Sequence, residues 1–260
     1  MSDLLLVSGL SLATAAVLMT ATAVVARAVG RIAVVDVTWG LGFVAIAAVG
    51  ALVGDGPRRL LLLVLVAVWG VRLAWHIGRR AVGHGEDPRY AELVGDGGFG
   101  VAIRKVFVVQ GLALWLVSLP VQVGASSAAS WWPAVGAGLA LWLVGLCFEA
   151  VGDAQLAAYR RDPDRPPVLA RGLWRYTRHP NYFGDACVWW GIWLVGGLAS
   201  GWLPGLLSVV APVAMTYFLV FATGARLLER TMMRREGYPA YAARTSMFVP
   251  LPPRPRGPEA

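Results

Sequence analysis

The densest polar chemistry of the chain lies in residues 172–185, which read GLWRYTRHPNYFGD and run directly into an apolar segment. A proline follows His179 and biases this histidine toward an extended backbone. Asn181 and Asp185 stand four residues apart, which places them on one face of the helix predicted to follow. Six basic residues lie between positions 160 and 178, and the planar guanidinium of arginine suits a polyphosphate. The stretch therefore indicates a site for a polyphosphate.

A second polar group precedes this stretch. Glu149, Asp153 and Arg160 recur at helical spacing, which predicts one polar face on a helix that leaves an apolar run. A solvated helix end explains Asp153 and Arg160, but Glu149 lies a turn deeper. Ionisable groups inside apolar spans cost about 2.5–3.5 kcal/mol each on insertion scales, so they normally mark function. We therefore expect this face to meet a polar ligand.

A third group lies in the N-terminal half. Trp69, Arg72 and His76 are spaced by three and four residues and share one face of a predicted helix. Asp36, with Trp39 on its own face, is the expected partner of Arg72. In a dry pocket the Asp36 carboxyl would hold a proton and could donate it, whereas pairing with Arg72 would keep it ionised. The sequence leaves open whether the pair is structural or belongs to a site.

The elements that must position these groups are membrane helices. The chain has 260 residues, of which 57% are hydrophobic. Its apolar runs are long enough to cross a hydrocarbon core of about 30 Å, which predicts an all-α integral membrane protein. We expect seven spans in one bundle, at residues 4–26, 32–53, 60–77, 103–123, 131–151, 182–199 and 203–224. The bundle forms one domain over residues 1–250, with a cofactor-binding half at about 145–250 and a disordered tail at 251–260.

Positive charge is confined to one set of connections. Of the 23 basic residues, 20 lie in 27–31, 78–105, 160–178 and the segment after 225. This positive-inside pattern predicts a cytoplasmic C-terminus and, with seven spans, an N-terminus outside. Arg58 and Arg59 are the basic pair on the opposite side. Topology thus explains most of the net charge of +8, and we predict no nucleic-acid partner.

Two other features argue against alternative classes. Cys147 and Cys187 lie within apolar spans, which argues against a disulfide scaffold and against a cysteine metal site, so no metal is expected. Residues 95–100, GDGGFG, match the dinucleotide pattern G-x-G-x-x-G. They lie between two predicted spans instead of after a strand, so we interpret them as a flexible loop.

Taken together, the motifs resemble a known family. RGLWRYTRHPNYFGD, with FEAVGDAQL upstream, resembles the DUF1295 group of bacterial membrane proteins, relatives of steroid 5-alpha-reductase. The similarity extends to residues 35–43, 69–90, 108–120 and 227–253 and covers nearly the whole chain. It implies a multi-pass protein of the bacterial inner membrane that binds NADPH. The implied reaction is reduction of an activated carbon–carbon double bond in a lipid-soluble, steroid-like or other lipid substrate.

The resemblance also implies roles for individual residues. In the reductases, cofactor contacts fall at positions matching Glu149, Asp153, Arg160, Asn181 and Asp185. To these we add as cofactor-binding candidates Arg171, Trp174, Arg178, His179, Tyr182, Tyr238 and Arg244. The catalytic candidates are Asp36, Trp69 and Arg72, and the substrate-side candidates are Trp39, His76, Glu86 and Tyr90. The family's tyrosine falls at Trp69, whose indole cannot relay a proton, so steroid specificity does not carry over.

Two rival interpretations stay open. S-adenosylmethionine-dependent methyltransferases of the isoprenylcysteine and phospholipid type have an R-H/N-P-x-Y-x-G motif, which residues 178–184 match. They also have a later glutamate, here Glu229, before a glycine–tyrosine motif like that at 237–241. The acidic residues Glu149 and Asp153 and the extra N-terminal helices favour the reductase. The third interpretation is a non-enzymatic bundle that binds sterol or lipid. We expect a monomer whose partners are a lipid-soluble substrate and membrane lipids.

Overall fold

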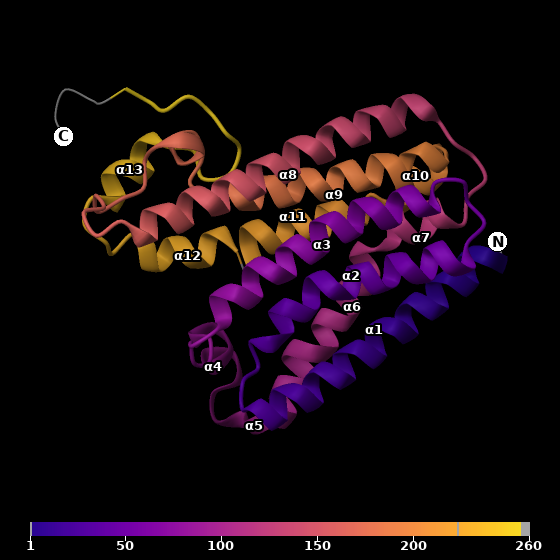
Figure 1. The fold of residues 1–260 in the computed structure, drawn as a ribbon, viewed down its shortest axis with the longest axis horizontal. Helices are drawn as coiled ribbons and strands as arrows, with labels where there is room; N and C mark the ends of the chain where they lie inside the picture. The colour runs from indigo at the N-terminus through magenta and orange to yellow at the C-terminus, as the bar shows by residue number, and fades with distance from the viewer. Residues whose placement is uncertain (1, 223, 256–260) are drawn as a thin grey trace. The chain divides into compact units, whose positions relative to one another are not determined.

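The computed structural model describes residues 2–222 and 224–255. These residues form helices and no β-strand, apart from an isolated bridge between Thr177 and Ser246. The predicted all-α class is confirmed. The α-helices are α1 (Ser2–Val29), α2 (Val34–Val53), α3 (Arg59–Ala81), α4 (Pro88–Val94), α5 (Gly98–Ala102), α6 (Val109–Val117), α7 (Leu119–Ala125), α8 (Trp132–Arg161), α9 (Pro180–Gly196), α10 (Trp202–Ser208), α11 (Val210–Tyr217), α12 (Ala225–Met232) and α13 (Tyr238–Arg244) (Figure 1).

The described residues contain six helical runs that are long and apolar enough to cross a membrane. These runs are Asp3–Val29, Val34–Val53, Arg59–Ala81, Pro88–Val117, Trp132–Arg161 and Trp202–Met232. The chain is therefore a multi-pass membrane protein. The predicted span 182–199 corresponds to helix α9. This helix has 17 residues, whereas about 20 are needed to cross the hydrocarbon core. The seventh span, like the orientation of the termini, stays a prediction.

Contacts divide the chain into two compact units. Unit 1 comprises Met1–Gly136 and Ile192–Ala211, and unit 2 comprises Ala137–Gly191 and Pro212–Ala260. The prediction of one domain over 1–250, with its cofactor half, stays a prediction. Within the tail predicted at 251–260, the Leu251 amide donates to the Tyr176 carbonyl oxygen at 3.0 Å, and residues 256–260 lie outside the described residues.

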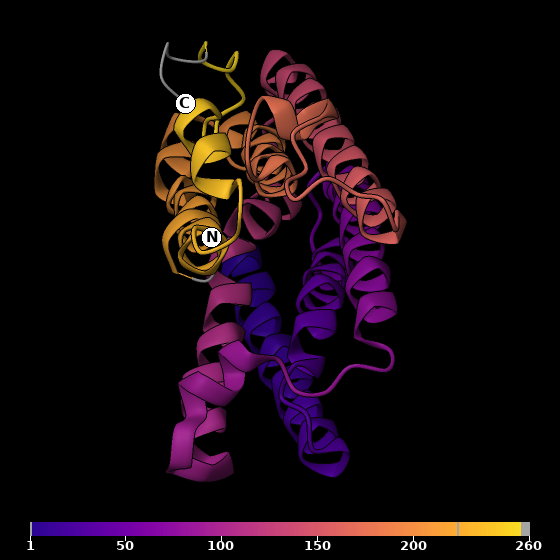
Figure 2. The same ribbon diagram turned by 90° about the vertical axis from the view of Figure 1, so that its left-hand side faces the viewer.

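In unit 1, helix α2 packs against α1 and α3, and α6 packs against α1 (Figure 1 and Figure 2). Two glycines allow α2 and α3 to approach closely: a Cβ on Gly40 would lie 2.5 Å from the Gly70 carbonyl oxygen, and a Cβ on Gly70 would lie 2.6 Å from that of Gly40. Trp69 is fully buried beside this crossing, 5.7 Å from the Phe43 ring. Close packing of small residues thus sets the α2–α3 pair.

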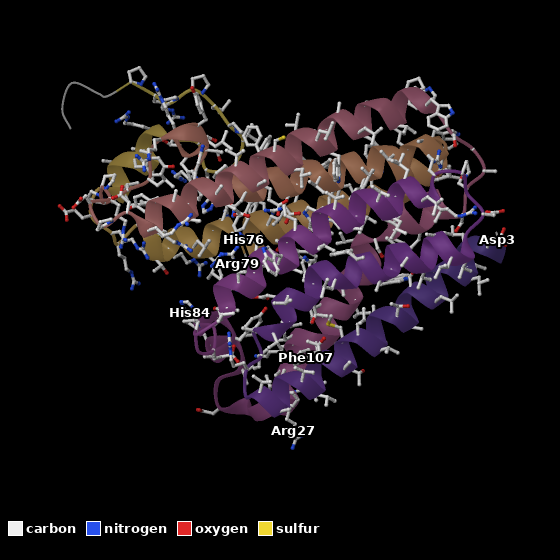
Figure 3. The ribbon with its side chains drawn as sticks, in the orientation of Figure 1. Asp3, Arg27, His76, Arg79, His84 and Phe107 are labelled. Carbon is white, nitrogen blue, oxygen red and sulfur yellow. The ribbon has the colours of Figure 1, made fainter. Side chains whose placement is uncertain are left out.

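Helix α1 exposes apolar side chains along its length, as lipid contact requires. Leu5 is 70% exposed and Val17 is 68% exposed. Its charges lie at its ends, with Asp3 in the first turn and Arg27 in the last turn (Figure 3). This arrangement also matches the helix dipole, which favours an acid at the start and a base at the end.

Two predictions about the middle of the chain are wrong in detail. The span predicted at 103–123 lies nearer the N-terminus, because the helical run that could cross a membrane extends from Pro88 to Val117 and includes a π-helical segment at Ile103–Val108. Pro120, which has no amide hydrogen to donate, starts a new helix after Ser118. Residues 95–100 are short helical turns and not a loop, since Gly95 and Gly98 take φ angles of 50° and 65° that let the chain turn between them.

In unit 2, glycines bring α8 and α9 into backbone contact. A Cβ on Gly145 would lie 2.5 Å from the Gly184 carbonyl oxygen, and a Cβ on Gly191 would lie 2.7 Å from the Gly138 carbonyl oxygen. Gly138 and Gly145 are seven residues apart, as are Gly184 and Gly191, so both contacts fall on the same pair of faces. The crossing also brings residue 184 against the backbone of Glu149. It therefore aligns the polar start of α9 with the polar end of α8.

Candidate functional site

The polar residues of unit 2 gather around Glu229. Its Oε1 accepts hydrogen bonds from the Tyr238 hydroxyl at 2.6 Å and from His179 Nε2 at 3.0 Å. Its Oε2 lies 3.1 Å from Nη2 of Arg178, and both side chains are 12% exposed. The ring of Tyr182 stacks on His179, with centroids 5.5 Å apart. Glu229 thus fixes the arginine and the histidine of the RHPNY motif in one orientation.

Arg178 is directed at groups of the protein itself. Its Nη1 donates to the carbonyl oxygens of Ala242, at 2.6 Å, and Thr245, at 3.2 Å. Thr177 Oγ1 donates to the carbonyl oxygen of Phe248 at 2.8 Å. These bonds tie the start of α9 to the C-terminal segment. The guanidinium therefore organises the site, and its contact with a cofactor stays a prediction.

Two tyrosines of α13 close this cluster. Burial raises the pKa of Tyr241, and burial together with the hydrogen bond to Glu229 raises the pKa of Tyr238. Both phenols therefore stay neutral donors. The Tyr241 hydroxyl donates to the Trp174 carbonyl oxygen, and Trp174 Nε1 donates to the Gly152 carbonyl oxygen at 3.1 Å. Trp174 is thereby held against α8.

Buried carboxylates occupy the facing parts of α8 and α9. Glu149 is 2% exposed, and Asp153 and Asp185 are each 7% exposed. Asn181 Nδ2 donates to Asp153 Oδ1 at 3.3 Å, which joins the two helices through predicted site residues. Ionised carboxylates only accept hydrogen bonds, so this group suits a ligand rich in hydroxyl and amide donors.

A pocket of about 290 Å³ lies beside α8 and is lined by Gln155, Ala158, Arg171 and Gly172. Gln155 Oε1 accepts from the Leu173 amide at 3.0 Å and so holds the turn that carries Arg171. Gly172 has a φ of 60°, and a Cβ there would lie 2.3 Å from the Gln155 side chain. Of the other predicted basic residues, Arg160 is exposed, and Arg244 is half-buried.

In unit 1 the predicted partner of Asp36 is wrong. Its carboxylate accepts from the Tyr90 hydroxyl and, at 3.1 Å, from Nη2 of Arg89, and not from Arg72. The reason is helical geometry: Gly70 and Ala74 face α2, whereas Arg72 is two residues, or about 200°, round the helix from Gly70. Tyr90 reaches Asp36 instead because α4 lies at the start of α2.

Glu86 holds α4 in that place. Its carboxylate accepts from the amides of Ile32 and Ala33 ahead of α2, the latter at 3.0 Å. The next residue, Asp87, accepts from the Arg89 amide at 2.9 Å. Burial alone would raise the pKa of Asp87, but hydrogen bonds from Arg89 leave it lowered. Glu86, predicted on the substrate side, therefore has a clear positional role.

The remaining predicted residues of unit 1 are distributed along α2 and α3. Trp69 belongs to the core, and the half-buried Trp39 meets Phe43 edge-on with ring centroids 4.9 Å apart. His76 lies near the end of α3 (Figure 3). Arg89 and Gln110 were not predicted from the sequence. Gln110 Nε2 donates to the Tyr90 hydroxyl oxygen at 3.2 Å. The sequence signal for Gln110 was a single glutamine inside an apolar run.

Residues 22–245 match the family model described as Protein of unknown function (DUF1295). This chain belongs to the DUF1295 family. The matched range includes both the Asp36–Tyr90 pair and the Glu229 cluster. No curated protein and no solved structure gives a match.

Proposed function

We propose that this DUF1295 protein is an NADPH-dependent reductase of an activated carbon–carbon double bond in a lipid-soluble enone. The Asp36–Tyr90 pair carries the proposal. Reduction of an enone places negative charge on the carbonyl oxygen, and a fixed donor at that oxygen lowers the barrier. The Tyr90 hydroxyl, which is 8% exposed, donates its one hydrogen to Asp36 and accepts from Gln110; it would become such a donor by turning that hydrogen from Asp36 to the substrate oxygen. In this proposal the phenol of Tyr90, on α4, takes the role of the family's tyrosine, which Trp69 cannot perform.

The polar side chains of unit 2 suit this cofactor. Bound NADPH would supply the hydride that the reaction needs, and water would supply the proton that the α carbon takes up. Asp153 and Asp185 would accept from ribose hydroxyls and the carboxamide, because carboxylates only accept hydrogen bonds. Arg171, at the 290 Å³ pocket, would meet a phosphate. Glu229 would act indirectly by holding Arg178 and His179 in place.

Ligand-dependent thermal stability of the purified protein in detergent tests this assignment. A ligand at 100 times its Kd stabilises by about 2.7 kcal/mol. We expect NADPH to raise the unfolding temperature, and Asp153→Asn and Arg171→Gln to remove this shift. The matched control is Arg161→Gln, because Arg161 is exposed and donates to the Ala157 carbonyl oxygen of its own helix. A shift that survives in both site variants would contradict the proposed site.

One observation favours the methyltransferase as a second candidate. The parts of that motif, Arg178, His179, Glu229 and Tyr238, form a single hydrogen-bonded cluster. In this case S-adenosylmethionine alone would stabilise the protein. If neither ligand produces a shift, a non-enzymatic lipid-binding bundle is favoured.

We further propose seven spans, with the N-terminus outside and the C-terminus in the cytoplasm of a bacterial inner membrane. Helix α9 packs along α8 through Gly145 and Gly184. The Ala199 carbonyl oxygen, just after α9, accepts from the Trp131 amide, just before α8, at 2.9 Å. The end of α9 therefore returns to the side on which α8 begins, as a crossing helix would. The side of the basic connections supports the orientation.

A further inference from the structure

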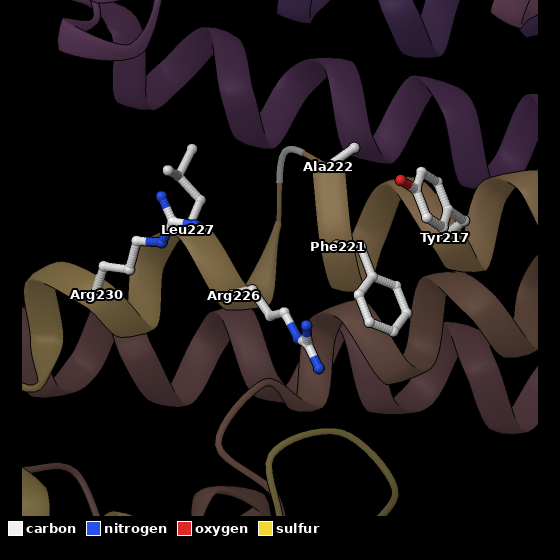
Figure 4. A pocket seen from close by; sticks show the side chains of 6 residues that line it. All are labelled: Tyr217, Phe221, Ala222, Arg226, Leu227 and Arg230. Atoms are coloured by element: carbon white, nitrogen blue, oxygen red, sulfur yellow. The ribbon is translucent and has the colours of Figure 1, made fainter.

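A second pocket of unit 2 lies apart from all the residues assigned above. It has a volume of about 320 Å³ and is lined by Tyr217, Phe221, Ala222, Arg226, Leu227 and Arg230 (Figure 4). It forms where the apolar run Trp202–Met232 changes from the π-helical segment Phe218–Ala222 to α12. The pocket therefore lies toward the end of a membrane span.

The pocket is positively charged, because its six lining residues include two arginines and no acidic residue. Arg226 and Arg230 are four residues apart on α12, so they share one face of the helix. Within residues 2–222 and 224–255, neither guanidinium pairs with a carboxylate. Glu229, their neighbour in sequence, is bonded to Arg178, His179 and Tyr238 instead. Two like charges at this spacing repel, and an anion bound at the pocket would supply their missing counter-charge.

The other end of the pocket is aromatic and exposed. Tyr217 and Phe221 stack with ring centroids 5.5 Å apart and are 55% and 47% exposed. The Arg226 guanidinium lies 4.5 Å from the centroid of the Phe221 ring. Along the chain the aromatic residues lie deeper in the span and the arginines nearer its end. This order, apolar inside and cationic outside, matches an amphiphile with an anionic head.

We propose that this pocket binds the phosphate headgroup of an anionic membrane lipid, with the acyl chains running along Tyr217 and Phe221. Basic pockets at the ends of membrane helices bind anionic headgroups, and aromatic rings favour the interface between headgroups and hydrocarbon. A phosphate without chains would meet the arginines but gain nothing from the aromatic pair. The site is independent of the proposed reductase activity.

To test this, phosphatidylglycerol is titrated into the purified protein in detergent micelles, and the unfolding temperature of the protein is measured. We expect a saturable rise with phosphatidylglycerol and a much smaller one with phosphatidylcholine. In Arg226→Gln/Arg230→Gln the apparent Kd should weaken roughly 25-fold, because each basic residue near an anionic surface contributes about a factor of five. The unfolding temperature without lipid reports whether the variant still folds.

The control is Arg234→Gln/Arg235→Gln, which removes the same charge from two exposed arginines outside the pocket. It should bind phosphatidylglycerol like the wild type. Equal weakening in both double variants would overturn the proposal, since it would mean that only overall charge matters. A rise with inorganic phosphate as large as that with phosphatidylglycerol, a block of the lipid effect by NADPH, or an equal response to phosphatidylcholine would also overturn it. Phe221→Ala should weaken the binding of phosphatidylglycerol without altering any response to inorganic phosphate.

Discussion

At the scale of single residues, the Tyr90 hydroxyl is the group on which the proposed chemistry depends. It lies 54 residues from Asp36 in the chain, yet its hydroxyl donates to that carboxylate. Three neighbours set its position: Glu86 anchors the preceding loop, Arg89 contacts the same carboxylate and Gln110 donates to the phenol oxygen. The phenol oxygen is therefore held in place before any substrate arrives, and its one hydrogen would have to turn from Asp36 to the substrate oxygen.

Replacement of Tyr90 by phenylalanine tests this role. We expect kcat with an enone that the wild type reduces to fall about 100-fold, as when one oxyanion donor is removed, while the NADPH-dependent stabilisation is unchanged. The rate is read as NADPH oxidation. Tyr159→Phe is the control, because the Tyr159 hydroxyl only donates to the nearby Pro166 carbonyl oxygen. An undiminished rate in Tyr90→Phe would remove the phenol from the mechanism.

At the scale of elements, glycine positions decide how closely α8 and α9 pack. In Gly145→Ala the new Cβ would lie 2.5 Å from the Gly184 carbonyl oxygen, so the helices must separate. We expect a loss of about 1–3 kcal/mol, typical of overpacking, together with weaker cofactor binding. Gly136→Ala, on the same helix but facing open space, should be neutral or stabilising. Thermal unfolding of both variants checks this, and equal effects would contradict the close contact.

Arg58 joins three connections of unit 1. It is 1% exposed, and it donates to the carbonyl oxygens of Ala129 and Ala199 and to the hydroxyls of Ser130 and Ser200, at 2.6–3.1 Å. Burial lowers the pKa of Arg58. This buried role explains why a basic residue occurs on the side where the positive-inside pattern predicts none.

Loss of Arg58 should therefore destabilise the fold. Arg58→Met keeps the length of the side chain but leaves buried acceptors without a donor, and we expect a loss of about 2–3 kcal/mol. Arg59→Met, at the adjacent half-buried position that starts α3, should cost far less. Denaturant or thermal unfolding in detergent distinguishes them. Similar losses of unfolding free energy in the two variants would show that positive charge, and not the hydrogen bonds of Arg58, stabilises these connections.

At the scale of the whole molecule, the number of spans decides on which side each connection lies. We expect α9 to cross the membrane. In a background without Cys147 and Cys187, Trp202→Cys should then react with a membrane-impermeant maleimide on intact cells. Asp164→Cys, in the connection before α9, should react only after permeabilisation. The same labelling pattern for both would mean that α9 does not cross.

The sequence by itself determined the all-α class, the membrane helices and most of the residues that now form the two polar clusters. Hydrophobic runs and helical spacing are local properties, so they can be read without a fold. Only the tertiary structure decided that Asp36 meets Tyr90 and Arg89 instead of Arg72, and that Glu229 joins Arg178 to His179. Such partners depend on which helix faces meet and on how loops fold back. At the α2–α3 crossing, that choice rests on the close approach of Gly40 and Gly70, a contact between residues 30 positions apart.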